Sequence, residues 1–493
     1  MTLAELLNRI GLRPDPFDDR EITALVHNSA QAAPGALFLC IRGARANGHR
    51  YAFDAYRRGC RCFVAEEPLD LPGDAAVFTV PDTHSTLGLL ASAFYGDPSR
   101  DLTVIGITGT KGKTTVSWML ASILNRSGIP CGYIGTNGIR YGTVTQKTDN
   151  STPDALILQR TLAGMRQAGC TAAVLEVSSQ ALLLDRVAGI SFRAAIFTNF
   201  SEDHIGPGEH PTPENYFACK HRLFTDFGIG TAICNADDPS SPAMMAGTTA
   251  TRVVTCGSDA GVDYRTLEIH PTGTDHRPGV ALTFVSDGRR VPCRLPLIGT
   301  VNASNALLAI ACAKEVFGVS PVRSADLLCG ITVPGRSEIL HLANGAIAVI
   351  DYAHNKASLR QLLEALRACR PERLICLFGS VGDRTSLRRA ELGAVAAELA
   401  DLCILTSDNP GNEPPEQIIA DIAASFRGSE TPFLCIPDRA EAIRRAVAML
   451  RPGDILALAG KGHETYQLIG NEKVPFSERE ILLSASDGLT PRV

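Results

Sequence analysis

Residues 102–115 read Leu102-Thr103-Val104-Ile105-Gly106-Ile107-Thr108-Gly109-Thr110-Lys111-Gly112-Lys113-Thr114-Thr115, and this stretch predicts the fold around it. Its first four residues are mostly apolar, which is typical of a buried strand. The glycines let the backbone curl so that successive N–H groups point at one anion, and the following helix directs its positive end to the same place. The stretch therefore predicts a strand, a phosphate-binding loop and a helix.

The side chains of this loop are of the types that bind ATP and Mg²⁺. Lys113 would neutralise phosphate oxygens, and the Thr114 hydroxyl would ligate Mg²⁺. The common loop has four residues between its first glycine and Gly-Lys, whereas here Gly106 leaves five and Gly109 leaves two. A glycine-rich turn without nucleotide is the alternative, but the strand–loop–helix context favours ATP. The residues expected to contact ATP are Gly109, Thr110, Lys111, Gly112, Lys113, Thr114 and Thr115.

The composition is that of an ordinary globular protein. At about 150 residues per domain, 493 residues predict about three domains, and 45% apolar residues provide an ample core. The net charge of −5 gives no reason to expect nucleic-acid binding. No apolar stretch approaches the ~18 residues of a membrane span, and residues 1–9 do not form a signal peptide. We therefore expect no nucleic-acid partner and no membrane insertion. We also expect the protein to be cytoplasmic and monomeric.

The fifteen cysteines are scattered mostly within apolar runs, and no Cys-x-x-Cys pair occurs. Cys60-Arg61-Cys62 alone is too little for a zinc site. We expect buried, free thiols in a reducing compartment.

The order of apolar runs predicts an α/β protein of three domains, over residues 1–97, 98–331 and 332–493. Continuous apolar strands separated by helices indicate parallel sheets covered on both faces. A polar, β-rich patch around residues 250–297 interrupts the second domain, and a helix over 302–316 follows it. The predicted strands lie at 36–41, 62–65, 104–106, 172–177, 194–197, 231–234, 346–351, 374–379, 402–406 and 454–459.

Two further strand ends carry candidate metal ligands. The strand over 172–177 ends at Glu176, and the next apolar strand is followed by Asp203-His204. Ligands of parallel sheets gather at the carboxyl ends of strands. A lone loop histidine is commonly only a hydrogen-bonding group, but the neighbouring phosphate loop favours a ligand role for His204. We expect Thr114, Glu176 and His204 to hold Mg²⁺.

In this order the motifs resemble those of the Mur ligases of peptidoglycan precursor synthesis. The resemblance covers nearly the whole chain. Its last part is similar to one branch, the UDP-N-acetylmuramoyl-tripeptide synthetases (MurE type), which join a diamino acid to UDP-MurNAc-L-Ala-D-Glu. The motifs are residues 106–115, Glu176-Val177-Ser178-Ser179, residues 198–204, Lys220, Asn302, Arg336, Asp351-Tyr352-Ala353-His354, Gly382-Asp383-Arg384, Asp408-Asn409-Pro410 and Gly460-Lys461-Gly462-His463-Glu464.

The resemblance implies roles that the residues alone do not. It implies that Lys220 is carbamylated by CO₂, so that an anion supplies ligands to a second Mg²⁺ beside His204; without it, Lys220 reads as a solvated helix residue. It implies a catalytic set of Lys113, Glu176, His204 and Lys220. It also implies contacts with ATP at Asn302, Arg336 and Asp351, with UDP-MurNAc-dipeptide at Ser29, His49, Thr152, Ser178 and Arg186, and with the amino acid at Arg384, Asp408, Asn409, Gly411, Gly460 and Glu464.

The implied architecture is a UDP-MurNAc-binding N-terminal domain, a central P-loop ATPase domain and a Rossmann-like C-terminal domain. The implied reaction is ATP-dependent amide ligation through an acyl phosphate of the D-Glu γ-carboxylate. Two alternatives stay open. One is a related ligase, such as a folylpolyglutamate or cyanophycin synthetase, against which Asn28-Ser29 and Gly48-His49 argue. The other is a non-catalytic or amidating subunit of a complex, against which the retained catalytic set argues.

One position bears on the amino acid that is added. Members of this branch that add meso-diaminopimelate usually read Asp-Asn-Pro-Arg, whose arginine pairs with the distal carboxylate. This chain reads Asp408-Asn409-Pro410-Gly411, and Arg388 or Arg389 taking over that pairing is the alternative. We therefore predict L-lysine, or a similar diamino acid, over meso-diaminopimelate. We also predict that Gly411→Arg shifts the preference toward meso-diaminopimelate by about 1.5–3 kcal/mol.

Overall fold

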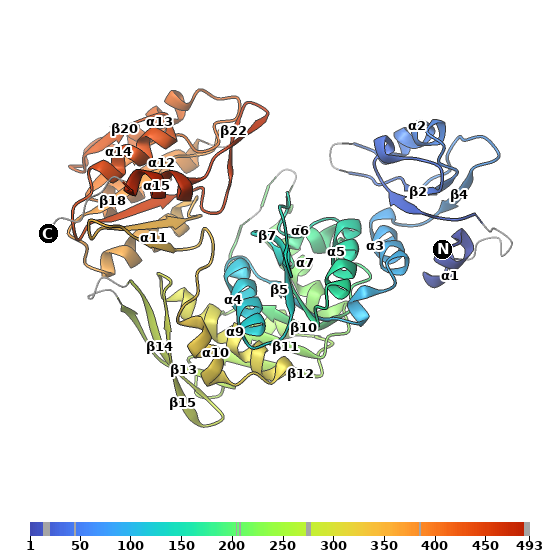
Figure 1. Cartoon of the computed structure of the whole chain (residues 1–493), viewed down its shortest axis with the longest axis horizontal. Helices are drawn as coiled ribbons and strands as arrows, with labels where there is room; N and C mark the ends of the chain where they lie inside the picture. Colours follow the sequence, from blue (N-terminus) through green and yellow to red (C-terminus); the bar gives the residue numbers. More distant parts are fainter. Residues whose placement is uncertain are drawn as a thin grey trace. The chain divides into compact units, whose positions relative to one another are not determined.

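A computed structural model describes residues 1–12, 20–43, 46–203, 205–206, 209–272, 278–383 and 386–487 (Figure 1). Contacts within the chain divide it into two compact units, each of which is described by itself. The first comprises Met1–Tyr264 with Leu308–Val319, and the second comprises Arg265–Leu307 with Ser320–Val493. The finer division into domains at residues 97 and 331 stays a prediction.

The first unit begins with a four-stranded parallel sheet in the order β1-β2-β3-β4. Successive side chains of a strand point to opposite faces, so β2 buries Leu37 and Leu39 against α1 and α3, and Phe38 on the face that α2 covers. The predicted strands at 36–41 and 62–65 are confirmed as β2 and β3. The elements are α1 (Leu3–Arg9), β1 (Ala24–Val26), η1 (Ser29–Gln31), β2 (Ala36–Leu39), η2 (Gly48–Tyr51), α2 (Ala52–Arg57), β3 (Cys62–Ala65), β4 (Ala76–Thr79) and α3 (Thr83–Phe94).

The rest of the first unit is built on strands in the order β12-β11-β10-β5-β9-β6-β7-β8, parallel as far as β6 and antiparallel beyond it. Because β5 lies between β10 and β9, the phosphate loop and the two other predicted strand ends meet at one edge. The elements are η3 (Pro98–Arg100), β5 (Thr103–Thr108), α4 (Lys113–Arg126), β6 (Cys131–Gly135), β7 (Gly138–Tyr141), β8 (Val144–Gln146), α5 (Ala155–Gln167), β9 (Ala172–Glu176), α6 (Ser179–Leu183), β10 (Phe192–Phe197), α7 (Pro213–Thr225), β11 (Thr231–Asn235), α8 (Ser241–Met245) and β12 (Arg252–Gly257).

The second unit contains an antiparallel β13-β14-β15 ladder and a sheet in the order β16-β17-β21-β18-β19-β20, in which β16 alone runs antiparallel. In β17, Ile347 and Val349 pack against α11, α12 and α13, whereas Ala348 and Ile350 pack against α14 and α15. This alternation explains the continuous apolar runs of the sequence.

Helix α9 (Val301–Phe317) begins in the second unit and belongs to the first unit from Leu308 onward. The other elements of the second unit are β13 (Tyr264–Thr272), β14 (Gly279–Ser286), β15 (Arg289–Leu295), α10 (Pro321–Leu328), β16 (Glu338–His341), β17 (Ile347–Asp351), α11 (Lys356–Ala368), β18 (Leu374–Phe378), α12 (Leu387–Leu399), β19 (Leu402–Leu405), α13 (Pro415–Ala423), η4 (Ala424–Phe426), β20 (Phe433–Cys435), α14 (Arg439–Ala448), β21 (Ile455–Ala459), β22 (Tyr466–Ile469), β23 (Glu472–Pro475) and α15 (Glu478–Ser486).

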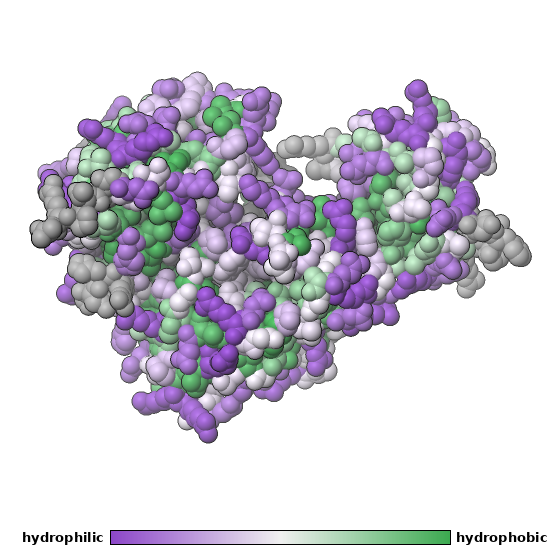
Figure 2. Space-filling view, viewed as in Figure 1, coloured by the Kyte–Doolittle hydropathy of each residue, from purple (hydrophilic) through white to green (hydrophobic). Residues whose placement is uncertain are grey.

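These sheets confirm the predicted α/β class, and the β-rich patch at 250–297 is confirmed as β12 to β15. All fifteen cysteines are free, and thirteen of them are buried, as expected. In the described parts of the chain no helix is long and apolar enough to span a membrane. The visible face of the molecule is mostly polar, with apolar residues in scattered patches (Figure 2).

Candidate active site

The phosphate loop joins β5 to α4 as the sequence predicted. Gly112 has φ 84° and directly precedes α4. Gly109 has φ 145°, and a Cβ atom there would overlap the Thr198 hydroxyl. Both positions therefore require glycine, one for its backbone conformation and one also for the close approach of a neighbouring strand end.

Asn199, which follows β10, forms hydrogen bonds with the phosphate loop. The Asn199 side chain accepts a hydrogen bond from Lys111 N at 2.9 Å, and Asn199 O accepts one from Thr110 N at 2.8 Å. Lys113 folds back over the loop, where its Nζ donates to Gly109 O at 2.8 Å and to Thr110 O at 2.9 Å. The ammonium group is therefore held next to the loop in which a phosphate chain would lie.

Glu176 is 1% exposed, and its carboxylate accepts only from neutral donors. The Tyr133 hydroxyl donates at 2.7 Å, Thr136 donates from its N–H at 2.8 Å and its hydroxyl at 3.0 Å, and Thr114 donates at 3.0 Å. No described residue forms an ion pair with this buried carboxylate. A divalent cation would balance its charge, so Glu176 and Thr114 fit the predicted magnesium site.

Lys220 lies on α7, and the interpretation as a solvated helix residue is wrong, because its side chain is 1% exposed. Its Nζ donates to Gly109 O at 2.9 Å and lies 4.2 Å from the centre of the Tyr216 ring. Burial and the nearby Lys113 charge lower the pKa of Lys220 well below its usual value. A lower pKa favours the neutral amine, which is the form that can attack CO₂.

His204 lies outside the described residues, so its predicted place beside Glu176 and Lys220 stays a prediction. Among the residues that are described, no three His, Cys, Asp or Glu side chains form a group that could hold a metal ion.

Three residues predicted to bind the dipeptide lie together beside Glu176. Thr152 Oγ1 donates to Glu176 O at 2.8 Å and accepts from Ser178 N at 3.0 Å. Arg186 donates to Thr152 O at 2.9 Å. Burial lowers the pKa of Arg186, but an arginine keeps its positive charge at neutral pH. The structure thus places a cation and two hydroxyls next to the candidate metal site.

The sequence reasoning missed His210, which is 1% exposed. Its Nδ1 lies 2.9 Å from Asn215 Oδ1, and its Nε2 lies 2.9 Å from Ser179 Oγ. The ring also lies 5.1 Å from that of Tyr216. His210 therefore links α7, which carries Lys220, to Ser179, which follows the strand that ends at Glu176. Its segment is rich in proline and glycine, which gave no signal of burial.

Ser29 and His49 lie in separate 3₁₀ turns, η1 and η2, that both pack against α2. Ser29 hydrogen-bonds the Asp54 side chain. His49 Nε2 accepts from Glu66 N at 3.0 Å, and burial lowers the pKa of His49. The turns are therefore brought near one helix, and the binding of uridine diphosphate there stays a prediction.

In the second unit, Lys461 joins the residues predicted to bind the amino acid. Its side chain is fully buried, and its Nζ lies 3.4 Å from Asp408 Oδ1, 2.8 Å from Asn409 Oδ1 and 2.6 Å from Glu464 Oε2. Two carboxylates share one ammonium, which leaves a net charge of −1. That charge favours a ligand that carries an ammonium group. At Gly460, a Cβ atom would come within 2.7 Å of Asp408 Oδ2.

The predicted ATP contacts of this unit are linked through Ser337. Asn302 Nδ2 donates to Ile298 O at 2.8 Å, and Ser337 connects Ile298 O, at 3.4 Å, with Asp351 Oδ2, at 2.6 Å. Burial raises the pKa of Asp351.

Arg336 lies 5.0 Å from the centre of the Tyr352 ring, and its buried Nε finds no hydrogen-bond partner among the described residues. Burial and the Arg336 and Lys461 charges lower the pKa of His463 to about 4, so this ring is neutral at pH 7. An unsatisfied arginine donor beside a neutral histidine supports the predicted role of Arg336 in holding an anionic ligand.

Arg384 lies outside the described residues, and its contact with the α-carboxylate stays a prediction. The neighbouring Asp383 occupies the space of the missing side chain at position 411. Gly411 has φ 59°, and a Cβ atom there would overlap Asp383 Oδ2. That oxygen also accepts hydrogen bonds from Asn412 N at 3.0 Å and Asn412 Nδ2 at 3.1 Å. An arginine at 411 would therefore require Asp383 to move.

This crowding makes Gly411 a test of the local structure. We expect Gly411→Ala to lower the free energy of unfolding by about 2–4 kcal/mol, because it adds crowding against Asp383 to the backbone cost of about 1–2 kcal/mol. Gly470→Ala is the matched control, since Gly470 has φ 57° and open space around it. Denaturant unfolding should show a smaller loss for Gly470→Ala. Equal losses would contradict the crowding by Asp383.

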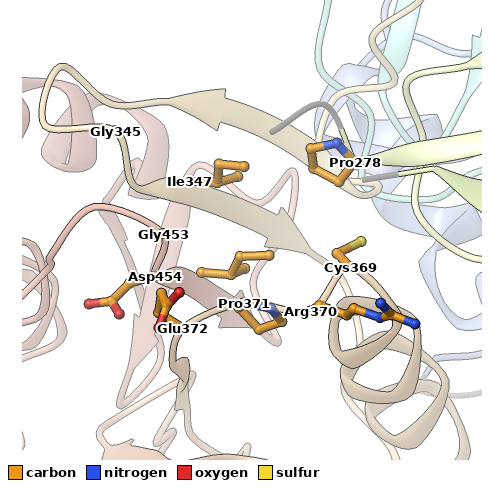
Figure 3. A pocket seen from close by; sticks show the side chains of 10 residues that line it. Pro278, Gly345, Ile347, Cys369, Arg370, Pro371, Glu372, Gly453 and Asp454 are labelled. Atoms are coloured by element: carbon orange, nitrogen blue, oxygen red, sulfur yellow. The ribbon is translucent and has the colours of Figure 1, made fainter. Parts of the chain in front are cut away.

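The second unit also has a cavity of about 200 Å³ at the amino ends of β17, β18 and β21 (Figure 3). Figure 3 shows that Arg370 points away from Glu372 and Asp454. Asp454 is already hydrogen-bonded to Arg373 and to Arg451 N. None of the predicted site residues lines this cavity, and ligands of parallel sheets bind at the opposite ends of the strands.

Comparison with known proteins assigns most of the chain to three family models. Residues 21–95 match the Mur ligase family catalytic domain, residues 107–313 match the Mur ligase middle domain, and residues 335–462 match the Mur ligase glutamate ligase domain.

Similar proteins include the UDP-N-acetylmuramoyl-L-alanyl-D-glutamate–2,6-diaminopimelate ligases of three bacteria. The ligase of Thermosynechococcus vestitus is 38% identical over 97% of both chains, and that of Gloeobacter violaceus is 40% identical over 97% of both. The ligase of Geobacillus thermodenitrificans is 34% identical over 98% of this chain and 99% of its own.

Two solved structures also match nearly the whole chain. A structure of a UDP-N-acetylmuramoyl-L-alanyl-D-glutamate–2,6-diaminopimelate ligase matches with a TM-score of 0.72 and 27% identity over 99% of both chains. The ADP complex of MurF ligase from Thermotoga maritima matches with a TM-score of 0.60 and 18% identity over 95% of this chain and 97% of its own, which shows a shared fold.

Proposed function

This chain belongs to the Mur ligase family, and from that membership we propose that it joins 2,6-diaminopimelate to UDP-N-acetylmuramoyl-L-alanyl-D-glutamate. It is an ATP-dependent acid–amino-acid ligase. The observation that carries the proposed substrates is the 38–40% identity, over 97% of both chains, to ligases named for this reaction. The prediction of L-lysine from Gly411 is replaced, because the relatives are named for 2,6-diaminopimelate.

The phosphate loop and its neighbours would bind ATP. Lys113 and the loop amides would face the phosphates, and Asn302, Arg336 and Asp351 are also proposed as ATP contacts. The buried Glu176 carboxylate, Thr114, His204 and a carbamylated Lys220 would hold Mg²⁺. When bound, Mg²⁺ would offset the charge of the transferring phosphoryl group.

In the proposed reaction, the D-Glu γ-carboxylate attacks the γ-phosphorus of ATP, and ADP leaves. The product is an acyl phosphate, and Lys113 would stabilise the transferring group. The amine of the amino acid then attacks the acyl carbon, phosphate leaves, and the nitrogen loses a proton. Asp408 and Glu464, which share the Lys461 ammonium, would orient the amino-acid end of that substrate.

A phosphate-release assay tests this function. The enzyme would receive ATP, Mg²⁺ and UDP-MurNAc-L-Ala-D-Glu with meso-diaminopimelate, with L-lysine or with no amino acid, and mass spectrometry would identify the product. We expect release to require both the dipeptide and an amino acid, with kcat/KM at least about tenfold higher for meso-diaminopimelate, as one charge-assisted hydrogen bond provides. A preference for L-lysine would contradict the proposed amino acid. Release with a folate and glutamate, but not with the dipeptide, would contradict the proposed substrate class.

A further inference from the structure

A diamino acid with a second carboxylate needs a cation at its far end, and position 411 does not supply one. Asp383 lies there instead, with its carboxylate held by Asn412. A carboxylate at this point repels the distal carboxylate of 2,6-diaminopimelate and attracts the distal ammonium. If the proposed function holds, the cation for the distal carboxylate comes from another part of the second unit.

Arg389 is not that cation. Its side chain is 4% exposed, and it donates to Glu413 Oε2 at 2.7 Å and to Asp421 Oδ2 at 2.8 Å. Two acidic partners already neutralise it and fix its position. Moving Arg389 toward a substrate would break both ion pairs of a buried guanidinium, which costs several kcal/mol.

Arg388, the residue before Arg389, is the other candidate cation for the distal carboxylate. It is half-buried, and in the described part of the chain it makes no hydrogen bond or ion pair. Glu391, one turn further along α12, contacts Lys356 Nζ at 3.8 Å, and Lys356 begins α11 directly after His354-Asn355. Residues three apart on a helix share a face, so Arg388 lies on the side of α12 that faces this loop.

Electrostatics agree with that placement. Burial lowers the pKa of His354, the positive charges of Arg388 and Arg336 lower it further, and the negative charge of Asp408 raises it. Arg388 and Asp408 therefore both act on one ring, so the Arg388 guanidinium lies near the residues predicted to bind the amino acid. Its planar group can bind a carboxylate through two parallel hydrogen bonds.

We infer that Arg388 binds the distal carboxylate of the diamino acid. An arginine at position 411 would otherwise make this contact. This inference rests on the proposed function and names the residue that selects 2,6-diaminopimelate over lysine. The distal ammonium would be oriented by Asp383.

The test compares wild type, Arg388→Gln, Arg388→Lys and a control, Arg445→Gln, whose residue is exposed on α14. For each protein, kcat and KM are measured with meso-diaminopimelate and with L-lysine, together with the KM for ATP. We expect Arg388→Gln to lower kcat/KM for meso-diaminopimelate by about 10–100-fold, mainly through KM, while kcat/KM for L-lysine changes less than about threefold. Arg388→Lys should lose less, because it keeps the charge but not the paired donors. The control should match wild type.

The possible outcomes separate the inference from the proposed function. Wild type that uses neither amino acid contradicts both. Wild type that ligates both amino acids but prefers L-lysine contradicts the proposed amino acid and, with it, the role of Arg388. An Arg388→Gln enzyme that loses both activities equally, or that raises the KM for ATP, contradicts only the role of Arg388. If Arg388→Gln does not fold by circular dichroism, Arg388→Lys decides: a loss confined to meso-diaminopimelate supports the inference, and no such loss overturns it.

Discussion

Lys113→Ala is expected to abolish ligation while the protein stays folded. The Lys113 ammonium is held over the phosphate loop by two backbone carbonyls, Gly109 O at 2.8 Å and Thr110 O at 2.9 Å. Alanine removes the point charge that would face the γ-phosphate, and losses of this kind raise the barrier by about 3–4 kcal/mol, or about 10²–10³ in kcat.

Phosphate release and thermal unfolding by circular dichroism would measure these two properties of Lys113→Ala. Arg126→Ala is the control, because Arg126 ends the same helix, α4, at its other end. The control should keep its activity. Near-normal turnover in a folded Lys113→Ala protein would show that this loop does not bind the reacting phosphates.

Lys220→Ala is expected to lose activity by about 10²–10³ and to regain part of it with a short carboxylic acid. The Lys220 side chain is buried, and its Nζ lies 2.9 Å from Gly109 O, at the phosphate loop. A carbamate there would place an anion beside the loop, whereas an unmodified ammonium would repel a metal ion. Alanine leaves space in which acetate or propionate can restore the missing carboxylate.

The acid should rescue Lys220→Ala but not Lys113→Ala, whose missing group is a cation. Added bicarbonate should raise the activity of wild type that has been depleted of CO₂. Because the pKa of Lys220 is lowered, the neutral amine persists as the pH falls below the usual lysine pKa, and this activation should persist with it. A crystal with bound metal and nucleotide that shows an unmodified Lys220 would refute the carbamate.

Local patterns predicted much of the fold and part of the site. The loop at 106–115 and the strand that ends at Glu176 were predictable, because glycine spacing and apolar runs act over a few residues. The meeting of these two strand ends followed from the rule that parallel strands present their carboxyl ends at one edge.

The partners of the site residues were not predictable in the same way. Tyr133 and Thr136 hold Glu176 from the neighbouring β6 and the turn after it, a pairing that depends on strand order rather than on any local motif. The space at Gly411 is filled by Asp383, which precedes it by 28 positions and reaches it only through the fold. The burial of Lys220 likewise depends on how α7 packs against the loop.

The Thr114 hydroxyl carries one hydrogen and two lone pairs, and its contacts with the described residues use only the hydrogen. It is donated to Glu176 Oε2 at 3.0 Å, so both lone pairs remain for another ligand. A cation could therefore bind this oxygen without breaking the bond to the carboxylate. A valine of nearly the same shape would lose both functions at once, whereas a serine would keep them. The identity of this residue is thus decided by its oxygen rather than by its volume.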